Sequence, residues 1–158
     1  NKPNGIAEAF IIGENFIQND DVCLILGDNL FFNSKAIHQK KLIKSSKIFV
    51  KEVKNPNKYG VLEIQNNVPI LIHEKPKENI SNYIVVGIYM YDNSVINKVK
   101  NLKPSNRGEL EITDLNNLYL KKGDCEIVYM ERNSVWFDSG DFDSLLNAAN
   151  FVSRNNIS

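Results

Sequence analysis

Short apolar runs that stop abruptly at polar residues are the feature of this sequence that most restricts its fold. The segment Asp21–Leu26 is apolar from Val22 onward and ends at Gly27-Asp28-Asn29. An apolar run without polar alternation is typical of a strand buried on both faces, as in a parallel sheet covered by helices. We therefore expect Asp28 to lie just beyond the carboxyl end of a buried strand.

Helical and strand-like segments alternate along the chain. Ile6–Ile17 carries apolar residues at helical spacing after a Pro-Asn-Gly turn. Further strands are predicted at Lys47–Val53, Tyr59–Ile64, Val68–Glu74, Tyr83–Tyr91, Glu126–Met130 and Val135–Phe137, and further helices at Asn93–Leu102, Leu110–Leu120 and Asp141–Val152, the last capped by Asp141 or Asp143. This alternation predicts an α/β domain with a largely parallel sheet.

The composition fits one globular domain and excludes several partner classes. The 158 residues include 19 basic and 19 acidic side chains, so no charge excess points to nucleic acid or an anionic membrane. The apolar runs are shorter than the roughly 20 residues that cross a bilayer, and no signal peptide is visible, so we expect a cytoplasmic protein. Cys23 and Cys125 are expected to be reduced core residues, with His38 at the surface and His73 in a strand.

Two aspartates occupy positions where α/β proteins bind ligands, at the ends of apolar strands. Asp28 follows Cys23–Gly27, and Asp138 follows Val135-Trp136-Phe137. Magnesium is commonly held by one or two carboxylates together with substrate phosphates, so this pair is a candidate Mg²⁺ site. Taken alone, each aspartate is better explained as the cap of a helix or turn.

Other strand ends carry groups suited to a sugar phosphate. Glu74-Lys75 places a hydrogen-bond acceptor beside a cation, although such a pair also occurs as a solvated strand end. Gly60, after Tyr59, and Gly87 lie in strands, where glycine either admits a ligand close to the backbone or marks a bulge.

A charged segment, Arg107–Asp114, precedes a predicted helix. Glu109 and Glu111 suit the positive end of the helix dipole, whereas Arg107 is a cation at the same end. The arginine therefore indicates either a phosphate clamp or an exposed loop residue.

In order and spacing, seven segments together resemble the glucose-1-phosphate thymidylyltransferases among the sugar nucleotidyltransferases. They are Asn4–Phe10, Leu26–Asn29, Tyr59–Val61, Glu74–Pro76, Val85–Asp92, Arg107–Asp114 and Trp136–Gly140. The Arg-Gly-Glu-Leu-Glu-Ile-Thr-Asp run is the most specific of them. The resemblance implies a three-layer, Rossmann-like nucleotidyltransferase domain.

The resemblance also implies a role for each candidate residue. Asp28 and Asp138 would bind the catalytic Mg²⁺, Lys75 and Arg107 would contact phosphates, and Gly5 would lie against the nucleotide base. The sugar site would be lined by Tyr59, Gly60, Glu74, Gly87 and Tyr89.

The implied reaction transfers dTMP from dTTP to glucose 1-phosphate and releases pyrophosphate, in a homo-oligomer that is usually a tetramer. The family's Gly-Gly-x-Gly-Thr-Arg-Leu loop, which holds the triphosphate, is not among these residues. We therefore expect residues 1–158 to be the carboxyl-side part of a single nucleotidyltransferase domain that lacks its first βα unit, and to be inactive alone. A non-catalytic sugar-nucleotide-binding remnant, or a relative using UTP or another sugar phosphate, would match the same segments.

Overall fold

The computed structural model describes residues 4–39 and 41–155. Its helices are α1 (Glu8–Ile12), α2 (Glu14–Ile17), α3 (Val95–Lys100), α4 (Ile112–Lys121) and α5 (Phe142–Arg154), with 3₁₀ turns η1 (Ala36–His38) and η2 (Pro56–Lys58). Its strands are β1 (Val22–Ile25), β2 (Asn29–Phe32), β3 (Ser46–Glu52), β4 (Gly60–Gln65), β5 (Val68–Glu74), β6 (Tyr83–Tyr91), β7 (Cys125–Tyr129) and β8 (Val135–Asp138).

Strand β6 is the centre of a six-stranded sheet. The strands follow the order β5-β4-β6-β3-β7, and β1 also pairs with β6. One edge of β6 pairs with β3, while the opposite edge pairs with β4 at Ile84 and with β1 from Ile88 to Tyr91. The two partners on that edge therefore diverge near Gly87, leaving a fork in the sheet.

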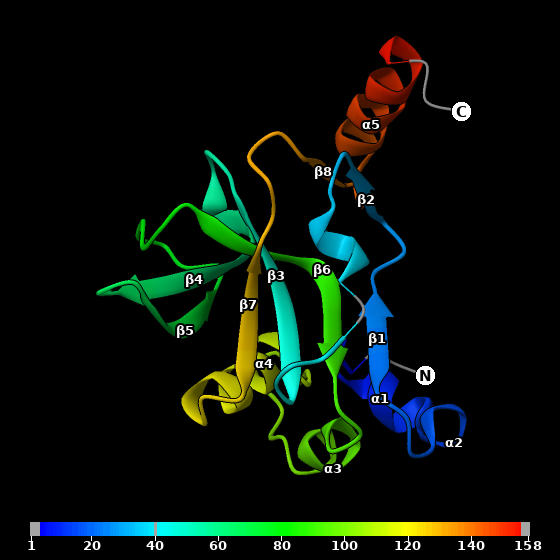
Figure 1. Ribbon diagram of the computed structural model, residues 1–158, viewed down its shortest axis with the longest axis vertical. Helices are drawn as coiled ribbons and strands as arrows, with labels where there is room; N and C mark the ends of the chain where they lie inside the picture. Colours follow the sequence, from blue (N-terminus) through cyan, green and yellow to red (C-terminus); the bar gives the residue numbers. More distant parts are fainter. Residues whose placement is uncertain (1–3, 40, 156–158) are drawn as a thin grey trace.

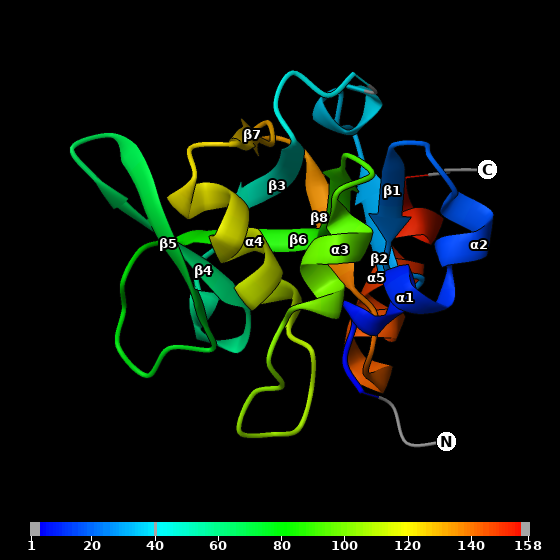
Figure 2. The ribbon, with the colours of Figure 1, turned by 90° about the horizontal axis from the view of Figure 1, so that it is seen from below.

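The two faces of the sheet are covered differently. Helices α1, α3 and α4 lie on one face, as both views show (Figures 1 and 2). Their side of the core contains Ile48 and Tyr91 from the sheet and Leu115 from α4. The other face packs Phe49 and Val86 against the region of η1, β2 and β8. Alternate residues of β3 and β6 thus enter opposite layers, which explains their continuous apolar sequences.

Most predicted elements are confirmed, and the α/β class is confirmed with them. The segments Val68–Glu74 and Tyr83–Tyr91 are strands with the predicted bounds, and Asp141 caps α5 by accepting a hydrogen bond from the Ser144 backbone N–H. The predicted first helix is instead two short helices that meet at Gly13. Strand β2 was not predicted, because its partner β8 lies about a hundred residues away in the sequence.

The prediction of a largely parallel sheet is wrong for the described strands. Strand β6 runs antiparallel to β1, β3 and β4, and only β3 and β7 pair in parallel. Burial on both faces produced the apolar runs, and burial does not specify strand direction. The hairpin between β4 and β5 has Asn66 and Asn67 at φ 50° and 62°, the left-handed pair typical of a two-residue turn.

Two predictions of burial also need correction. Strand β1 alternates between half-buried and exposed residues, with Ile25 55% exposed. Cys23 shares that exposed face, so it is not a core residue, whereas Cys125 is buried as predicted. His38 is exposed and His73 lies in β5, as expected. No helix in residues 4–39 and 41–155 is long and apolar enough to cross a membrane.

Helix α4 depends on Leu115 for its attachment to the sheet, because this side chain is fully buried. Leu115→Ala should lower the free energy of unfolding by about 2–5 kcal/mol, through lost transfer energy and the cavity left behind. Leu118 is on the same helix but 38% exposed, so Leu118→Ala should change it by less than roughly 0.5 kcal/mol. Urea denaturation of both variants measures the difference, and equal losses would contradict this account of the core.

Candidate active site

A cavity of about 230 Å³ lies at the fork where β1 and β4 diverge from each other along one edge of β6. Its walls include most of the residues that the sequence predicted, namely Asp28, Tyr59, Gly60, Glu74, Lys75, Gly87, Tyr89 and Asp138. These residues come from five different segments, so the fold gathers them into one site. Gly5 and Arg107 are not part of this lining.

Asp28 and Asp138 are brought together by the β2–β8 ribbon. Asn29 is directly opposite Asp138 in this antiparallel pair, and the Ser139 backbone N–H donates to the Asp28 carbonyl at 2.8 Å. A Cβ atom placed on Gly140 would lie 3.2 Å from Asp28 Oδ2 and 3.6 Å from Asp138 Oδ1. Carboxylate oxygens of both residues therefore face one point. Both aspartates lie at or just beyond strand ends, as predicted, but an antiparallel ribbon rather than a parallel sheet places them together.

The two carboxylates repel each other in a partly buried setting. Burial, and then the neighbouring charge of Asp28, raise the pKa of Asp138. A divalent cation between them would remove this repulsion, and hard oxygen ligands are those that Mg²⁺ prefers. No group of three or more His, Cys, Asp or Glu side chains suited to a metal occurs in the described part of the chain. Further oxygens would therefore have to come from water or substrate phosphates.

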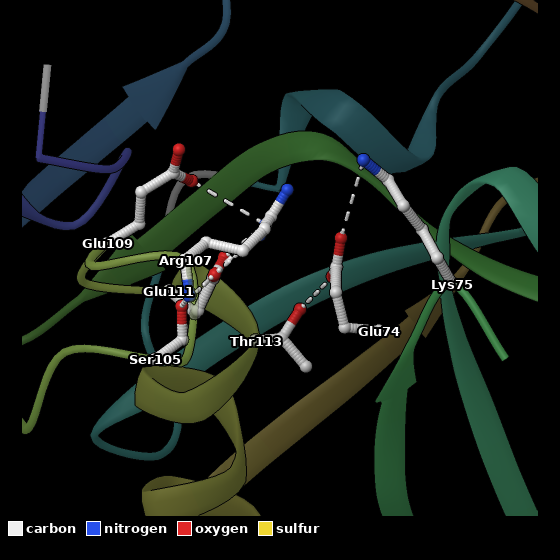
Figure 3. Close-up of polar contacts among 7 residues, drawn as sticks. All are labelled: Glu74, Lys75, Ser105, Arg107, Glu109, Glu111 and Thr113. Atoms are coloured by element: carbon white, nitrogen blue, oxygen red, sulfur yellow. Dashed lines mark hydrogen bonds and ion pairs between the residues drawn. The ribbon is translucent and has the colours of Figure 1, made fainter.

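Glu74, at the end of β5, also lines the cavity. Its Oε2 atom accepts a hydrogen bond of 2.6 Å from the hydroxyl of Thr113, a buried residue of α4 (Figure 3). Glu74 is also the cross-strand partner of Gly60. A Cβ atom placed on Gly60 would lie 3.7 Å from Glu74 Oε2, so the carboxylate packs beside the glycine. The arrangement fixes one carboxylate oxygen and leaves Oε1 for another partner.

Lys75 follows Glu74 with an unusual backbone conformation. Its φ angle is 44°, in the left-handed region, and its backbone N–H donates to the Tyr59 carbonyl at 3.0 Å. Its ammonium lies 3.9 Å from Glu74 Oε1 and its side chain is 55% exposed. The strained turn therefore directs a cation to the cavity mouth beside the glutamate.

Aromatic side chains complete the cavity. The rings of Tyr59 and Trp136 meet edge to face at 5.3 Å. Tyr89 is 5% exposed, and burial followed by the charge of Glu74 raises its pKa. Its hydroxyl therefore remains protonated at neutral pH, and Tyr89 acts as a neutral wall of the site.

Arg107 has acidic partners outside the cavity lining. Its guanidinium donates to Glu111 from Nε at 3.1 Å and from Nη2 at 2.8 Å, and Glu109 lies 3.5 Å away. Hydrogen bonding to Glu111 raises the arginine's pKa further. The cation that is misplaced beside a helix start is thus neutralised by its own neighbours. Figure 3 shows Glu74 between the Arg107 and Lys75 side chains.

Gly5 has a local structural requirement for glycine. Its φ angle is 101°, and an added Cβ would lie 2.5 Å from the Leu110 carbonyl oxygen. The residue borders a second hollow of about 400 Å³, which shares Ile6 and Leu26 with the cavity. Its predicted contact with a nucleotide base stays a prediction.

Comparison with known proteins identifies the family. The model of the "Nucleotidyl transferase" family matches residues 1–155. This chain belongs to the nucleotidyl transferase family. It is 44% identical over 155 residues to the glucose-1-phosphate thymidylyltransferase of Neisseria meningitidis and 42% identical over 156 residues to that of Mycolicibacterium smegmatis. The alignments cover 95% and 96% of the chain but 54% of each relative, so the chain spans about half their length.

Solved structures agree with this assignment. A Bacillus anthracis protein provisionally named glucose-1-phosphate thymidylyltransferase, crystallised with a sucrose, matches with a TM-score of 0.84 and 42% identity. The match covers 96% of this chain and 62% of that one. A UDP-glucose pyrophosphorylase solved with UDP-glucose matches with a TM-score of 0.81 at 22% identity, covering 98% of this chain and 64% of that one. The predicted resemblance and the nucleotidyltransferase fold are thereby confirmed.

Several cavity residues of this nucleotidyl transferase were not predicted from the sequence. They are Asn29, Lys58, Thr113, Asn116 and Trp136, among others. Thr113 and Trp136 lie inside segments used for the resemblance, so only their side-chain directions were missing. Asn116 is buried and accepts a 2.6 Å hydrogen bond from the Tyr91 hydroxyl, a long-range contact that no local pattern indicates.

Replacing Lys75 should separate its backbone conformation from its charge. Lys75→Gly relieves a left-handed cost of roughly 1–2 kcal/mol, partly offset by roughly 0.5–1 kcal/mol from the freer unfolded chain. Lys75→Ala removes the same charge but keeps the disfavoured φ. We expect the glycine variant to be more stable than the alanine variant by up to about 1 kcal/mol. Urea denaturation tests this, and an alanine variant as stable as the glycine variant would show that φ costs nothing here.

Proposed function

We propose that this chain provides the metal and sugar-phosphate side of a glucose-1-phosphate thymidylyltransferase. The observation that carries the proposal is that one cavity is lined both by the Asp28–Asp138 pair and by Glu74 with Lys75. Relatives with that name at 42–44% identity support it. On this proposal, residues 1–158 form the carboxyl-side part of one nucleotidyltransferase domain.

The proposed reaction is an in-line displacement at phosphorus. An oxygen of the sugar phosphate attacks the α-phosphorus of dTTP, the bond to the bridging oxygen breaks, and pyrophosphate leaves with that electron pair. Asp28 and Asp138 would hold a divalent cation, which we propose is Mg²⁺. When bound, the cation offsets negative charge that builds up on the phosphate oxygens.

The remaining side chains have positioning roles in this proposal. Glu74 Oε1 accepts hydrogen bonds from sugar hydroxyls, because Thr113 already occupies Oε2. Lys75 contributes a point charge to a phosphate at the cavity mouth. Tyr59, Gly60, Gly87 and Tyr89 shape the sugar wall. Such placement lowers the barrier by holding the reacting groups in line.

Two of the proposed roles belong to residues outside the cavity lining, Gly5 and Arg107. Gly5 would contact the nucleotide base from the neighbouring hollow. Arg107 would contact a phosphate from outside the cavity lining, while three hydrogen bonds hold its guanidinium on Glu111. We further propose a cytoplasmic homo-oligomer, without nucleic acid or membrane partners.

Pyrophosphate release tests the reaction directly. The assay uses the 158 residues in one chain behind a segment with the family's glycine-rich loop, and pairs dTTP or UTP with several sugar phosphates. Preference for dTTP and glucose 1-phosphate supports the proposal. Preference for UTP or another sugar phosphate assigns a related enzyme. Binding of dTDP-glucose without turnover in any combination would identify a non-catalytic binding protein.

Loss of either metal-site carboxylate should remove turnover in that assay. Asp28→Asn and Asp138→Asn keep the side-chain shape but remove a charge, so we expect kcat to fall by about 10²-fold or more. Asp143→Asn is the matched control, because Asp143 is an exposed residue in the first turn of α5. Near-normal kcat in the two site variants would remove the metal assignment.

Loss of Glu74 should act mainly on the sugar phosphate. Glu74→Ala removes the acceptor for sugar hydroxyls, so KM for glucose 1-phosphate should rise by about tenfold or more while KM for dTTP changes little. Glu63→Ala is the control, because Glu63 lies on neighbouring β4 and pairs with His73 outside the cavity. An unchanged sugar KM in Glu74→Ala would eliminate this role.

A further inference from the structure

The fork in the sheet leaves one backbone group of β6 without a strand partner. At Gly87 the carbonyl accepts a hydrogen bond of 2.8 Å from the Leu26 N–H as β1 ends. The Gly87 N–H faces the same edge, where β4 has already turned away. Its partner is a side chain: Asn29 Oδ1 accepts this N–H at 3.0 Å. An asparagine thus replaces the missing strand at the fork.

The carboxamide of Asn29 joins three parts of the cavity in a fixed orientation. Its Oδ1 atom accepts from the Trp136 indole N–H at 2.7 Å as well as from Gly87. Both partners are obligatory donors, so the oxygen must face them and the NH₂ group must face away. That NH₂ group donates to Asp28 Oδ1 at 2.9 Å. Gly87 and Trp136 therefore fix the orientation of the amide group that donates a hydrogen bond to Asp28.

The absence of a side chain at Gly87 serves this contact. A Cβ atom there would lie 2.6 Å from both Cγ and Oδ1 of Asn29. Real Cβ atoms do not approach so closely, so any larger residue would displace the carboxamide. The space beside Gly87 is occupied by Asn29, so this contact by itself requires a glycine here.

Asp28 is left with one free oxygen on the side of Asp138. Asn29 occupies Oδ1, while Oδ2 lies 3.2 Å from the Cβ position of Gly140, the point that Asp138 Oδ1 also approaches. Rotation of the Asp28 carboxylate would break its bond to Asn29. The amide therefore presents Oδ2 toward the partner carboxylate.

We propose that Asn29 is a positioning residue that orients Asp28 for the divalent cation, with Gly87 and Trp136 as its anchors. The inference rests on the proposed function, because it assigns the cation to Asp28 and Asp138. Residues that orient a metal ligand typically contribute about 10–100-fold to metal affinity. Asn29 belongs to this class, since it touches the ligand and is itself held from two sides.

Binding of Mn²⁺ to the extended chain of the pyrophosphate assay, with saturating dTDP-glucose, tests the inference without turnover. The EPR signal of free Mn²⁺ measures affinity. We expect Asn29→Ala to weaken it about tenfold or more, and Gly87→Ala to weaken it similarly by displacing the amide. Asn15→Ala, at an exposed position of α2, should leave it unchanged.

A double-mutant cycle separates positioning from a general structural effect. If Asn29 acts through Asp28, adding Asn29→Ala to Asp28→Asn should cause no further loss of the residual Mn²⁺ affinity. A further tenfold loss in that background would overturn the inference. Wild-type Mn²⁺ affinity in Asn29→Ala, together with weakened Mn²⁺ affinity in Asp28→Asn, would also overturn the inference. Wild-type affinity in both Asp28→Asn and Asp138→Asn would instead overturn the proposed metal site itself.

Discussion

Strand β6 pairs with three other strands and contributes side chains to both core layers, and the rest of the structure depends on this arrangement. Both ends of β6 pair with β3, across an irregularity between Ile48 and Val50, while β4 and β1 share the opposite edge. Since two strands cannot occupy the same stretch of edge, they separate near Gly87. The cavity forms at this separation. The same strand therefore supplies both the centre of the core and the floor of the site.

A fork in a sheet exposes backbone polar groups, and an unpaired buried group is costly. Here the Leu26 N–H and the Asn29 side chain satisfy the two groups of Gly87. The two residues that satisfy Gly87 lie within two positions of Asp28, which faces Asp138 across the ribbon. Repair of the backbone and placement of the acidic pair are thus one arrangement, which explains why a glycine, an amide and a carboxylate occur together here.

Electrostatics divide the site although the whole chain has no net charge. Asp28 and Asp138 concentrate negative charge at the ribbon, and Lys75 carries positive charge at the mouth. Glu109 and Glu111 form ion pairs with Arg107 and neutralise most of its charge. A polar substrate with phosphates would therefore meet both an acidic pair and a lysine in one small cavity.

The sequence by itself determined the α/β class, most helices and strands, and a set of site residues most of which line the cavity, because apolar periodicity and strand-end chemistry are local properties of the chain. Only the tertiary structure decided strand direction, the β2–β8 ribbon and the exposure of Cys23. It also decided that Arg107 pairs with Glu111 rather than with the cavity, and that Asn29 fills the space beside Gly87. These outcomes depend on which distant segments compete for the same edge or the same charge, and a local pattern contains no record of that competition.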